Sequence, residues 1–407
     1  MSLLQNQQFS VDFEIEINHR YENVPPLYID IDEQSDLNFL QVYAKQFETK
    51  PKLKGKTKGF FLSGNEKSLK LAQDNVSQLN HYGFEIPPVH SITDNDYSNY
   101  KEALSKMKQY ERENGKFDLI VSIGGARPED IAKKLAYETD LPLYAVATVI
   151  SSDALASPNY VMKDNHEKFT SSQIAVPPLA LNIDKGTIEV IDKYFIERDS
   201  NPFNSPYSSA LAEVAAKRGE IIDFEMRAKN GRERYSLDLV KQAYQTLIKF
   251  PKNQIREQSG IHLTASVLTQ FGNSYTILGG TESGSNGNHD WLKAYESLMS
   301  KTSKEIYHGH GVFYGDVIRA AAEQKFEQKT ESPSPKELLI LAEKFGIPTD
   351  AREAGFGIRT AEDALELTPH VRPERLTQWK IWDQKGLLTR ESRKEIIKDA
   401  LIFNNKN

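Results

Sequence analysis

The sequence of 407 residues predicts an α/β half followed by an all-helical half. Two observations support this fold class. Up to about residue 186, short apolar runs typical of strands alternate with segments of helical spacing, which predicts a parallel sheet with helical crossovers. After residue 186, apolar residues recur at helical spacing and the strand pattern disappears. We therefore predict two domains, residues 1–186 and residues 187–407.

The first domain contains several runs with the composition of strands. Residues 11–18 alternate apolar and polar side chains, as expected for a half-buried strand. A helix is predicted over residues 69–83, with Gly83 as its C-cap. The buried strands of the parallel sheet are predicted at residues 59–65, 117–125, 141–149 and 179–184.

Composition excludes several classes of protein. The net charge of −6 and the absence of a basic stripe argue against a nucleic-acid partner. The chain has no cysteine, so disulfides and thiolate metal ligands are excluded. No apolar run of membrane-spanning length occurs, and the N-terminal residues lack the basic and apolar regions of a signal peptide. We expect a cytoplasmic protein, and the sequence leaves a homo-oligomer open.

A glycine turn joins the predicted strand at residues 117–125 to a predicted helix, in the segment "SIGGARPEDIAKKLA" (122–136). Pro128 suits the first helical turn, where its missing N–H has no partner to lose, and Asp130 lies in the same turn. Gly124 and Gly125 would let a phosphate approach the free N–H groups at the helix N-terminus. The turn alone is equally compatible with a tight strand–helix connection that binds nothing.

The following segment, "LPLYAVATVISSDALASP" (141–158), adds a second motif. Together with the glycine turn it resembles the superfamily of dehydroquinate synthase and the iron-containing, metal-dependent polyol dehydrogenases. That superfamily has a G-G-G-x-x-x-D turn followed by P-T-x-x-S-x-D-x-x-A-S-P. The matching positions here are Gly124, Gly125, Asp130, Thr148, Ser151, Asp153, Ala156, Ser157 and Pro158, and the departures are Ala126 and Ala147.

Four further segments extend the resemblance in order over roughly residues 115–380. They are "SALAEVAAKRGEI" (209–221), "GGTESGSNGNHDW" (279–291), "IYHGHGVFYGDVI" (306–318) and "HVRPERLTQW" (370–379). The ordered set is most similar to the sn-glycerol-1-phosphate dehydrogenases. The resemblance implies a Rossmann-like nucleotide-binding domain followed by an all-α metal-binding domain.

The resemblance also implies one divalent metal, held by Glu213, His289 and His308. One carboxylate and two imidazoles leave an open coordination position, as catalytic zinc sites do, and the same donors suit nickel, iron or manganese. From spacing alone, Glu213 lies on the flank of an apolar stripe, where a solvated glutamate is the expected interpretation. Each histidine taken singly would more often be a packed or capping residue.

The remaining site residues are assigned by the same resemblance. Asp153 would bind or orient substrate hydroxyls, with a capping role in its turn as the alternative. Thr148 and Ser151 would line the nicotinamide side. Lys293 stands where the family has a second histidine, four residues after His289, so it shares a helix face with it. We expect Lys293 to reach a small anionic substrate, with a surface lysine as the alternative.

These expectations predict a metal-dependent, NAD- or NADP-linked oxidoreductase that acts on a small polyol phosphate and reduces dihydroxyacetone phosphate. The strand ending in "SGN" (63–65) has no acidic residue to select against a 2′-phosphate, so NADP stays open. A dehydroquinate synthase-like cyclase using NAD transiently is the first alternative. A divergent member with reassigned or lost activity is the second, indicated by Ala126, by Lys293 and by His310, which replaces a family glutamate and would otherwise orient His308.

Overall fold

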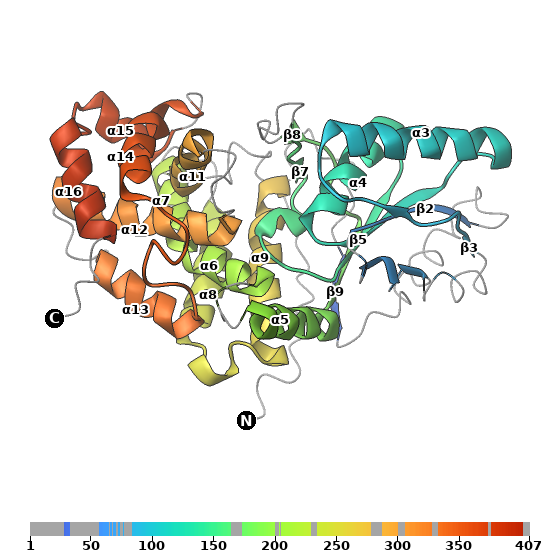
Figure 1. The fold of residues 1–407 in the computed structure, drawn as a ribbon, viewed down its shortest axis with the longest axis horizontal. Coiled ribbons are helices and arrows are strands. Elements are labelled where there is room, and N and C mark those ends of the chain that lie inside the picture. Colours follow the sequence, from blue (N-terminus) through green and yellow to red (C-terminus); the bar gives the residue numbers. More distant parts are fainter. Residues whose placement is uncertain are drawn as a thin grey trace.

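The structure is a computed structural model that describes most of the chain after residue 83 and parts of the chain before it. The described residues are 28–32, 57–64, 66, 68–70, 72–73, 76, 84–163, 173–199, 203, 205–228, 234–277, 287–299, 306–327, 333–372 and 376–401. An α/β half and a helical half lie side by side, as Figure 1 shows. The predicted strand at 11–18 and the predicted cap Gly83 lie outside the described residues.

A seven-stranded parallel sheet forms the α/β half, and it confirms the four buried strands that the sequence predicts. The helix expected over 69–83 is helical at its described residues up to 76. A small antiparallel pair, β7 with β8, was not predicted. The spatial order is β1 (Tyr28–Asp32), β9 (Ala180–Asp184), β6 (Leu143–Ala147), β5 (Leu119–Gly124), β2 (Thr57–Ser63) and β3 (Phe84–Glu85), with β4 (His90–Ser91) also on β2; the small pair is Asn159–Tyr160 and Gln173–Ile174.

Both faces of this sheet are buried, which explains the nearly continuous apolar strand sequences. Phe60 and Ile120 point to the face covered by α3 (Tyr97–Asn114) and α4 (Ala126–Thr139). Phe61, next to Phe60 in β2, belongs to a separate cluster on the opposite face. The alternation follows from strand geometry, in which successive side chains point to opposite faces.

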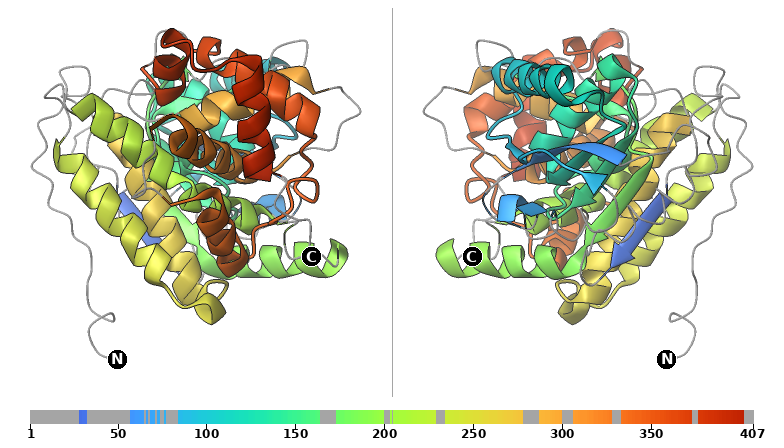
Figure 2. Two further views of the ribbon diagram at one scale, coloured as in Figure 1. Left: turned by 90° about the vertical axis from the view of Figure 1, so that its left-hand side faces the viewer. Right: turned by 90° about the vertical axis from the view of Figure 1, so that its right-hand side faces the viewer.

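Every described element of secondary structure after β9 is helical, as the sequence predicts. Helices α7, α8 and α9 run side by side along one flank (Figure 2). The α-helices are α5 (Lys185–Asp199), α6 (Pro206–Ala215), α7 (Lys217–Ala228), α8 (Arg234–Lys249), α9 (Gln258–Ile277), α11 (Gly287–Leu298), α12 (His308–Glu327), α13 (Pro335–Phe345), α14 (Ile358–Leu367), α15 (Gln378–Gln384) and α16 (Arg390–Leu401).

The predicted boundary at residue 186 falls just inside α5, which begins at Lys185 directly after β9. The largest cluster of buried apolar residues joins the ends of β6 and β9 to α6, α9 and α12. Packing is therefore continuous across the boundary, and the division into two domains stays a prediction.

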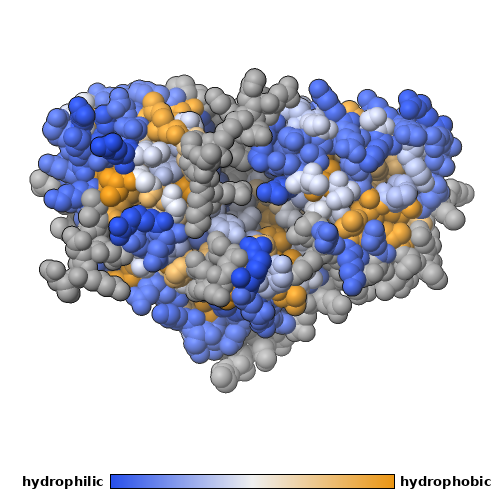
Figure 3. Space-filling model, in the orientation of Figure 1, coloured by the Kyte–Doolittle hydropathy of each residue, from blue (hydrophilic) through white to orange (hydrophobic). Residues whose placement is uncertain are grey.

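The surface of the face drawn in Figure 3 is mostly hydrophilic where its residues are described, with separate apolar patches on both halves. Within the described ranges, no helix combines the length and apolar character that crossing a membrane requires.

Candidate functional site

Three helices of the second half bring the predicted metal ligands together. Glu213 lies near the end of α6, His289 in the first turn of α11 and His308 at the first position of α12. Helix α6 begins where Ser205 caps it, since the Ser205 side chain accepts a hydrogen bond from the Ser208 N–H. Helix α12 packs against both α6 and α11, so the three ligand-bearing segments meet.

Two glycines of α12 make this close packing geometrically feasible. A Cβ atom on Gly309 would lie 1.8 Å from the backbone oxygen of Ser209 in α6. A Cβ atom on Gly311 would lie 2.2 Å from a methyl carbon of Leu292 in α11. Both distances are far below van der Waals contact. At Gly309 the obstacle is backbone, so a side chain there would force α12 away from α6, whereas at Gly311 the Leu292 side chain would have to shift. The backbone beside His308 is therefore seated directly on α6.

The donor atoms of the three predicted ligands lie within 4.8 Å of one another. His308 Nε2 is 3.8 Å from Glu213 Oε2, and the centroids of the two imidazole rings are 5.2 Å apart. Glu213 is fully buried and His289 nearly so, whereas the His308 side chain is 45% exposed. The group is thus buried at its base and open to solvent at His308.

The burial of Glu213 corrects the interpretation from spacing alone, which favoured a solvated glutamate. All but the first residue of α6 are buried, because α9, α12 and α13 pack against it. An amphipathic pattern cannot show such burial, since it assumes that one helix face meets water. Burial at this position is compatible with the ligand role that the resemblance implies, and that role stays a prediction.

The chemistry of Glu213 fits a bound cation. Its Oε1 accepts hydrogen bonds from the Asp153 N–H at 3.3 Å and from Lys217 Nζ at 3.4 Å. Its Oε2 is buried and has no hydrogen-bond partner among the residues that the structure describes. A buried carboxylate oxygen left unpaired is costly, and a cation between it and the two imidazoles would remove that cost. The three residues therefore fit a divalent metal.

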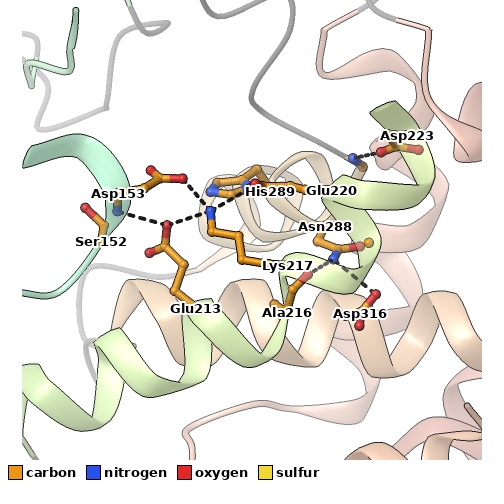
Figure 4. A network of polar contacts seen from close by, with 12 residues as sticks. Ser152, Asp153, Glu213, Ala216, Lys217, Glu220, Asp223, Asn288, His289 and Asp316 are labelled. Atoms are coloured by element: carbon orange, nitrogen blue, oxygen red, sulfur yellow. Dashed lines mark hydrogen bonds and ion pairs between the residues drawn. The ribbon is translucent and has the colours of Figure 1, made fainter. Parts of the chain in front are cut away.

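A network of charged side chains adjoins the candidate ligands Glu213 and His289 (Figure 4). Lys217 Nζ donates to Asp153, to Glu220 at 2.8 Å and to Glu213. Glu220 Oε1 in turn lies 4.0 Å from His289 Nδ1. Asp153 thus contacts the group through both its carboxylate and its backbone N–H, at the start of the η1 turn (Asp153–Ala156).

Burial and the neighbouring charges shift the pKa values of these groups. Burial, followed by the Asp153 and Glu220 carboxylates, raises the pKa of Glu213 well above its usual value. Burial opposes a charge on Lys217, but Asp153, Glu220 and Glu213 together hold its pKa above the usual range. Burial and nearby cations place the pKa of His289 well below 6.5, so its imidazole is neutral at pH 7, as metal binding requires.

The charge of Lys293 acts on both imidazoles. Lys293 is half-buried on α11, one turn beyond His289. Burial of the two imidazoles is the largest cause that lowers the pKa values of His289 and His308, and the charge of Lys293 is a further cause. Arg372 also acts on His289 and is paired with Asp290. The charges of Lys293 and Arg372 thus act on His289, and the charge of Lys293 acts on His308 as well.

His310 is buried and makes contacts that link α12 to α6. Its Nε2 lies 3.1 Å from the Ser208 hydroxyl, and its ring packs edge-on against Tyr307. This arrangement gives His310 a packing role between helices. The sequence alone offered only an orienting role toward His308 or a mark of altered activity.

The glycine turn lies at the carboxyl end of β5, beside the end of β2. Gly124 has φ +150°, and a Cβ there would lie 2.8 Å from Pro128 Cγ, so glycine is required by the turn itself. Gly125 is the N-cap of α4 and makes no side-chain cap, which leaves the first N–H groups of the helix for an anion. From β2 the chain continues to β3 on one side of β2 and then returns to β5 on the other side of β2, so the strand order reverses between β2 and β5. In open α/β sheets, nucleotides bind at such a switch point.

Three other predicted nucleotide-site residues are engaged by the fold. Thr148 donates its N–H to the Gly124 carbonyl, and its buried hydroxyl is 3.0 Å from that of Ser68. The Ser151 carbonyl accepts from the Ser209 hydroxyl. Asp130 is buried, and its carboxylate accepts from the side chain of Asn95 and the N–H of Val161. Asp130 thus ties α4 to two loops, and its assignment to the nucleotide stays a prediction.

Lys217 and Glu220 were not identified from the sequence. Their signal was present in the spacing, since Lys217 follows Glu213 by four residues and precedes Glu220 by three. Such spacing is common on solvated helices, where ion pairs contribute little. Only the burial of all three side chains distinguishes this group.

Comparisons with known proteins agree with this fold. Residues 52–190 match the family model described as iron-containing alcohol dehydrogenase. The glycerol-1-phosphate dehydrogenase (NAD(P)+) of Pyrobaculum arsenaticum is 24% identical over 283 residues, which cover 69% of this chain and 78% of the relative. The protein of the same name from Methanospirillum hungatei is 26% identical over 285 residues, or 69% and 71% of the two chains.

Solved structures show the same fold at lower identity. A probable glycerol dehydrogenase from Sinorhizobium meliloti superposes with a TM-score of 0.64 at 13% identity, over 94% of this chain and 98% of the other. Maleylacetate reductase from Agrobacterium tumefaciens has a TM-score of 0.61 at 14% identity, over 93% and 97%. The α/β half followed by a helical half is therefore an architecture that these proteins share.

Proposed function

Because the chain belongs to the iron-containing alcohol dehydrogenase superfamily and is an NAD(P)-dependent dehydrogenase, we propose that it reduces dihydroxyacetone phosphate to glycerol 1-phosphate. The observation that carries this proposal is the convergence of Glu213, His289 and His308, with Glu213 Oε2 buried and unpartnered among the described residues. The names of the relatives supply the substrate class.

Glu213, His289 and His308 would hold one divalent metal, which acts as a Lewis acid on the substrate carbonyl when bound. Asp153 lies next to Glu213, with its carboxylate fixed by Lys217. We assign it the orientation of a substrate hydroxyl. His308, the most exposed of the ligands, marks the side from which substrate enters.

The nucleotide would bind at the glycine turn. Gly124 and Gly125 would lie under the pyrophosphate, which the free N–H groups of α4 would bind. Thr148 and Ser151 come directly after β6, the strand next to β5, and would line the nicotinamide side. Strand β2 ends at Ser63 and Gly64 without a carboxylate, which favours acceptance of both NAD and NADP.

Lys293 would bind the substrate phosphate. It carries a positive charge beside two imidazoles and a bound dication, an arrangement that an arriving anion stabilises. A neutral triose would gain nothing from this charge. Discrimination between the phosphorylated and the neutral ketone is therefore the sharpest test.

The experiment compares kcat/KM for dihydroxyacetone phosphate with that for dihydroxyacetone, with NADH and with NADPH, in the metal-loaded protein. We expect wild type to prefer the phosphate ester and Lys293→Met to lose at least about 10-fold of that preference, as loss of a charged hydrogen bond of about 1.5–3 kcal/mol implies. Lys336→Met, at an exposed position of α13, serves as the matched control and should keep the wild-type ratio.

Three results would count against the assignment. A wild-type preference for the neutral ketone would exclude a phosphorylated substrate. An unchanged ratio in Lys293→Met would show that another group binds the anion. Absence of turnover in protein that binds both metal and nucleotide would favour a divergent member with a different substrate.

A further inference from the structure

The Lys217 side chain lies among the carboxylates of Asp153, Glu213 and Glu220, at the base of the candidate metal site. We propose that the Lys217 ammonium occupies the place of a second cation, which limits the site to one metal ion and leaves Glu213 a single oxygen for it. The inference rests on the proposed metal site formed by Glu213, His289 and His308.

The geometry around Lys217 Nζ is that of a cation site. Nζ contacts Asp153 Oδ2, Glu220 Oε1 at 2.8 Å and Glu213 Oε1 at 3.4 Å. The side chains of Lys217, Glu213 and Glu220 are each no more than 1% exposed, and that of Asp153 is 10% exposed. Three carboxylate oxygens thus converge on one point that is almost shielded from water (Figure 4).

The Lys217 ammonium reduces the negative charge of the three carboxylates to that of one divalent ion. Three ionised carboxylates and one ammonium leave a net charge of −2, which a single divalent ion between Glu213, His289 and His308 neutralises. Without the ammonium the net charge is −3, and three oxygens converge on an empty point. Carboxylate oxygens are the preferred ligands of Mn²⁺ and Mg²⁺, so this point would accept a second ion.

Lys217 also positions the first ligand. Its contact with Glu213 Oε1, together with the N–H of Asp153, fixes one oxygen of that carboxylate. The other oxygen, Oε2, is then directed to within 3.8 Å of His308 Nε2. Lys217 is therefore a positioning residue, because it acts on the metal through Glu213.

The test measures the number of Mn²⁺ ions bound per chain by metal-free protein, using equilibrium dialysis and isothermal titration, with circular dichroism as the check on folding. We expect one ion in wild type, two in Lys217→Met and one in Lys217→Arg, which keeps the positive charge. The double variant Lys217→Met/Glu220→Gln should return to one ion, because it removes a ligand of the second position. Spin coupling in the Mn²⁺ electron paramagnetic resonance spectrum of Lys217→Met would show that the two ions are adjacent.

Lys133→Met is the matched control. Lys133 is also buried and also pairs with a glutamate four residues earlier, Glu129, at 2.8 Å. That variant should bind one ion.

The outcomes separate the two proposals. No Mn²⁺ bound to wild type would overturn the metal site itself. One ion in wild type and one in folded Lys217→Met, with the same affinity and spectrum, would overturn the role of Lys217 while leaving the metal site intact. If the methionine variant does not fold, Lys217→Gln is held to the same criteria, since its amide is uncharged but can still donate to a carboxylate.

Discussion

Replacing Gly309 by alanine is expected to separate α12 from α6 and to weaken metal binding strongly. The added Cβ would lie 1.8 Å from the Ser209 carbonyl oxygen, and real Cβ atoms essentially never come closer than 3.0 Å to such an atom. The backbone at Gly309 must therefore move by at least 3.0 − 1.8 = 1.2 Å relative to the Ser209 carbonyl oxygen. His308, the adjacent residue, moves with it.

The size of this displacement sets the expected loss. Metal–ligand distances tolerate only about 0.2 Å, so a displacement of 1.2 Å removes His308 from productive coordination. Misplacement by about 1 Å in an active site can cost about 100-fold, and we expect a loss of metal affinity of that order. Alanine favours a helix over glycine by only about 0.5–1 kcal/mol, whereas overpacking costs about 1–3 kcal/mol, so the steric effect should dominate stability as well.

The assay is competition for Zn²⁺ against a chromophoric chelator, with thermal unfolding followed by circular dichroism. Gly357→Ala is the control, because a Cβ there meets its nearest atoms at ordinary distances of 3.6 and 3.8 Å. The control should bind metal as wild type does. Wild-type metal affinity in folded Gly309→Ala would refute the reasoning, since it would show that His308 does not depend on the close approach of α12 to α6.

Three further predictions concern the ligands and the nucleotide. Gly125→Val should lose most NADH and NADPH affinity, measured by nucleotide fluorescence, with an unchanged circular dichroism spectrum; retained affinity would place the nucleotide elsewhere. His289→Ala and His308→Ala should each hold well below one metal per chain by elemental analysis, and full occupancy in both would move the metal site. In metal-free protein the pKa of Glu213 is raised by burial and by Asp153, so its carboxyl favours folding below pH 4.5 and loses that contribution as the pH rises through the pKa of the folded state. Metal-free Glu213→Gln should therefore unfold at a higher temperature than metal-free wild type at pH 8, with the difference shrinking toward pH 4; a less stable variant at pH 8 would contradict this.

The sequence by itself determined the parallel sheet and the helical half. Strands such as β5 and β6 are buried on both faces, so their composition is apolar throughout and visible without any knowledge of their neighbours. The turn at Gly124 was equally predictable, because local geometry demands glycine there. The candidate metal ligands were identified by ordered resemblance, and their spacing alone would have misassigned Glu213.

Only the tertiary structure decided which polar residues act together. Glu213 meets Asp153 across 60 positions of the chain, and Gly309 meets Ser209 across 100. The burial of Glu213 and the charge environment of Lys217 are set by these distant neighbours, whereas helical periodicity records only the residues within a few turns. A buried charge is stabilised by its partners, so the same Glu-x-x-x-Lys spacing that is unremarkable on a solvated helix becomes, in this fold, a buried ion pair beside the candidate metal ligands.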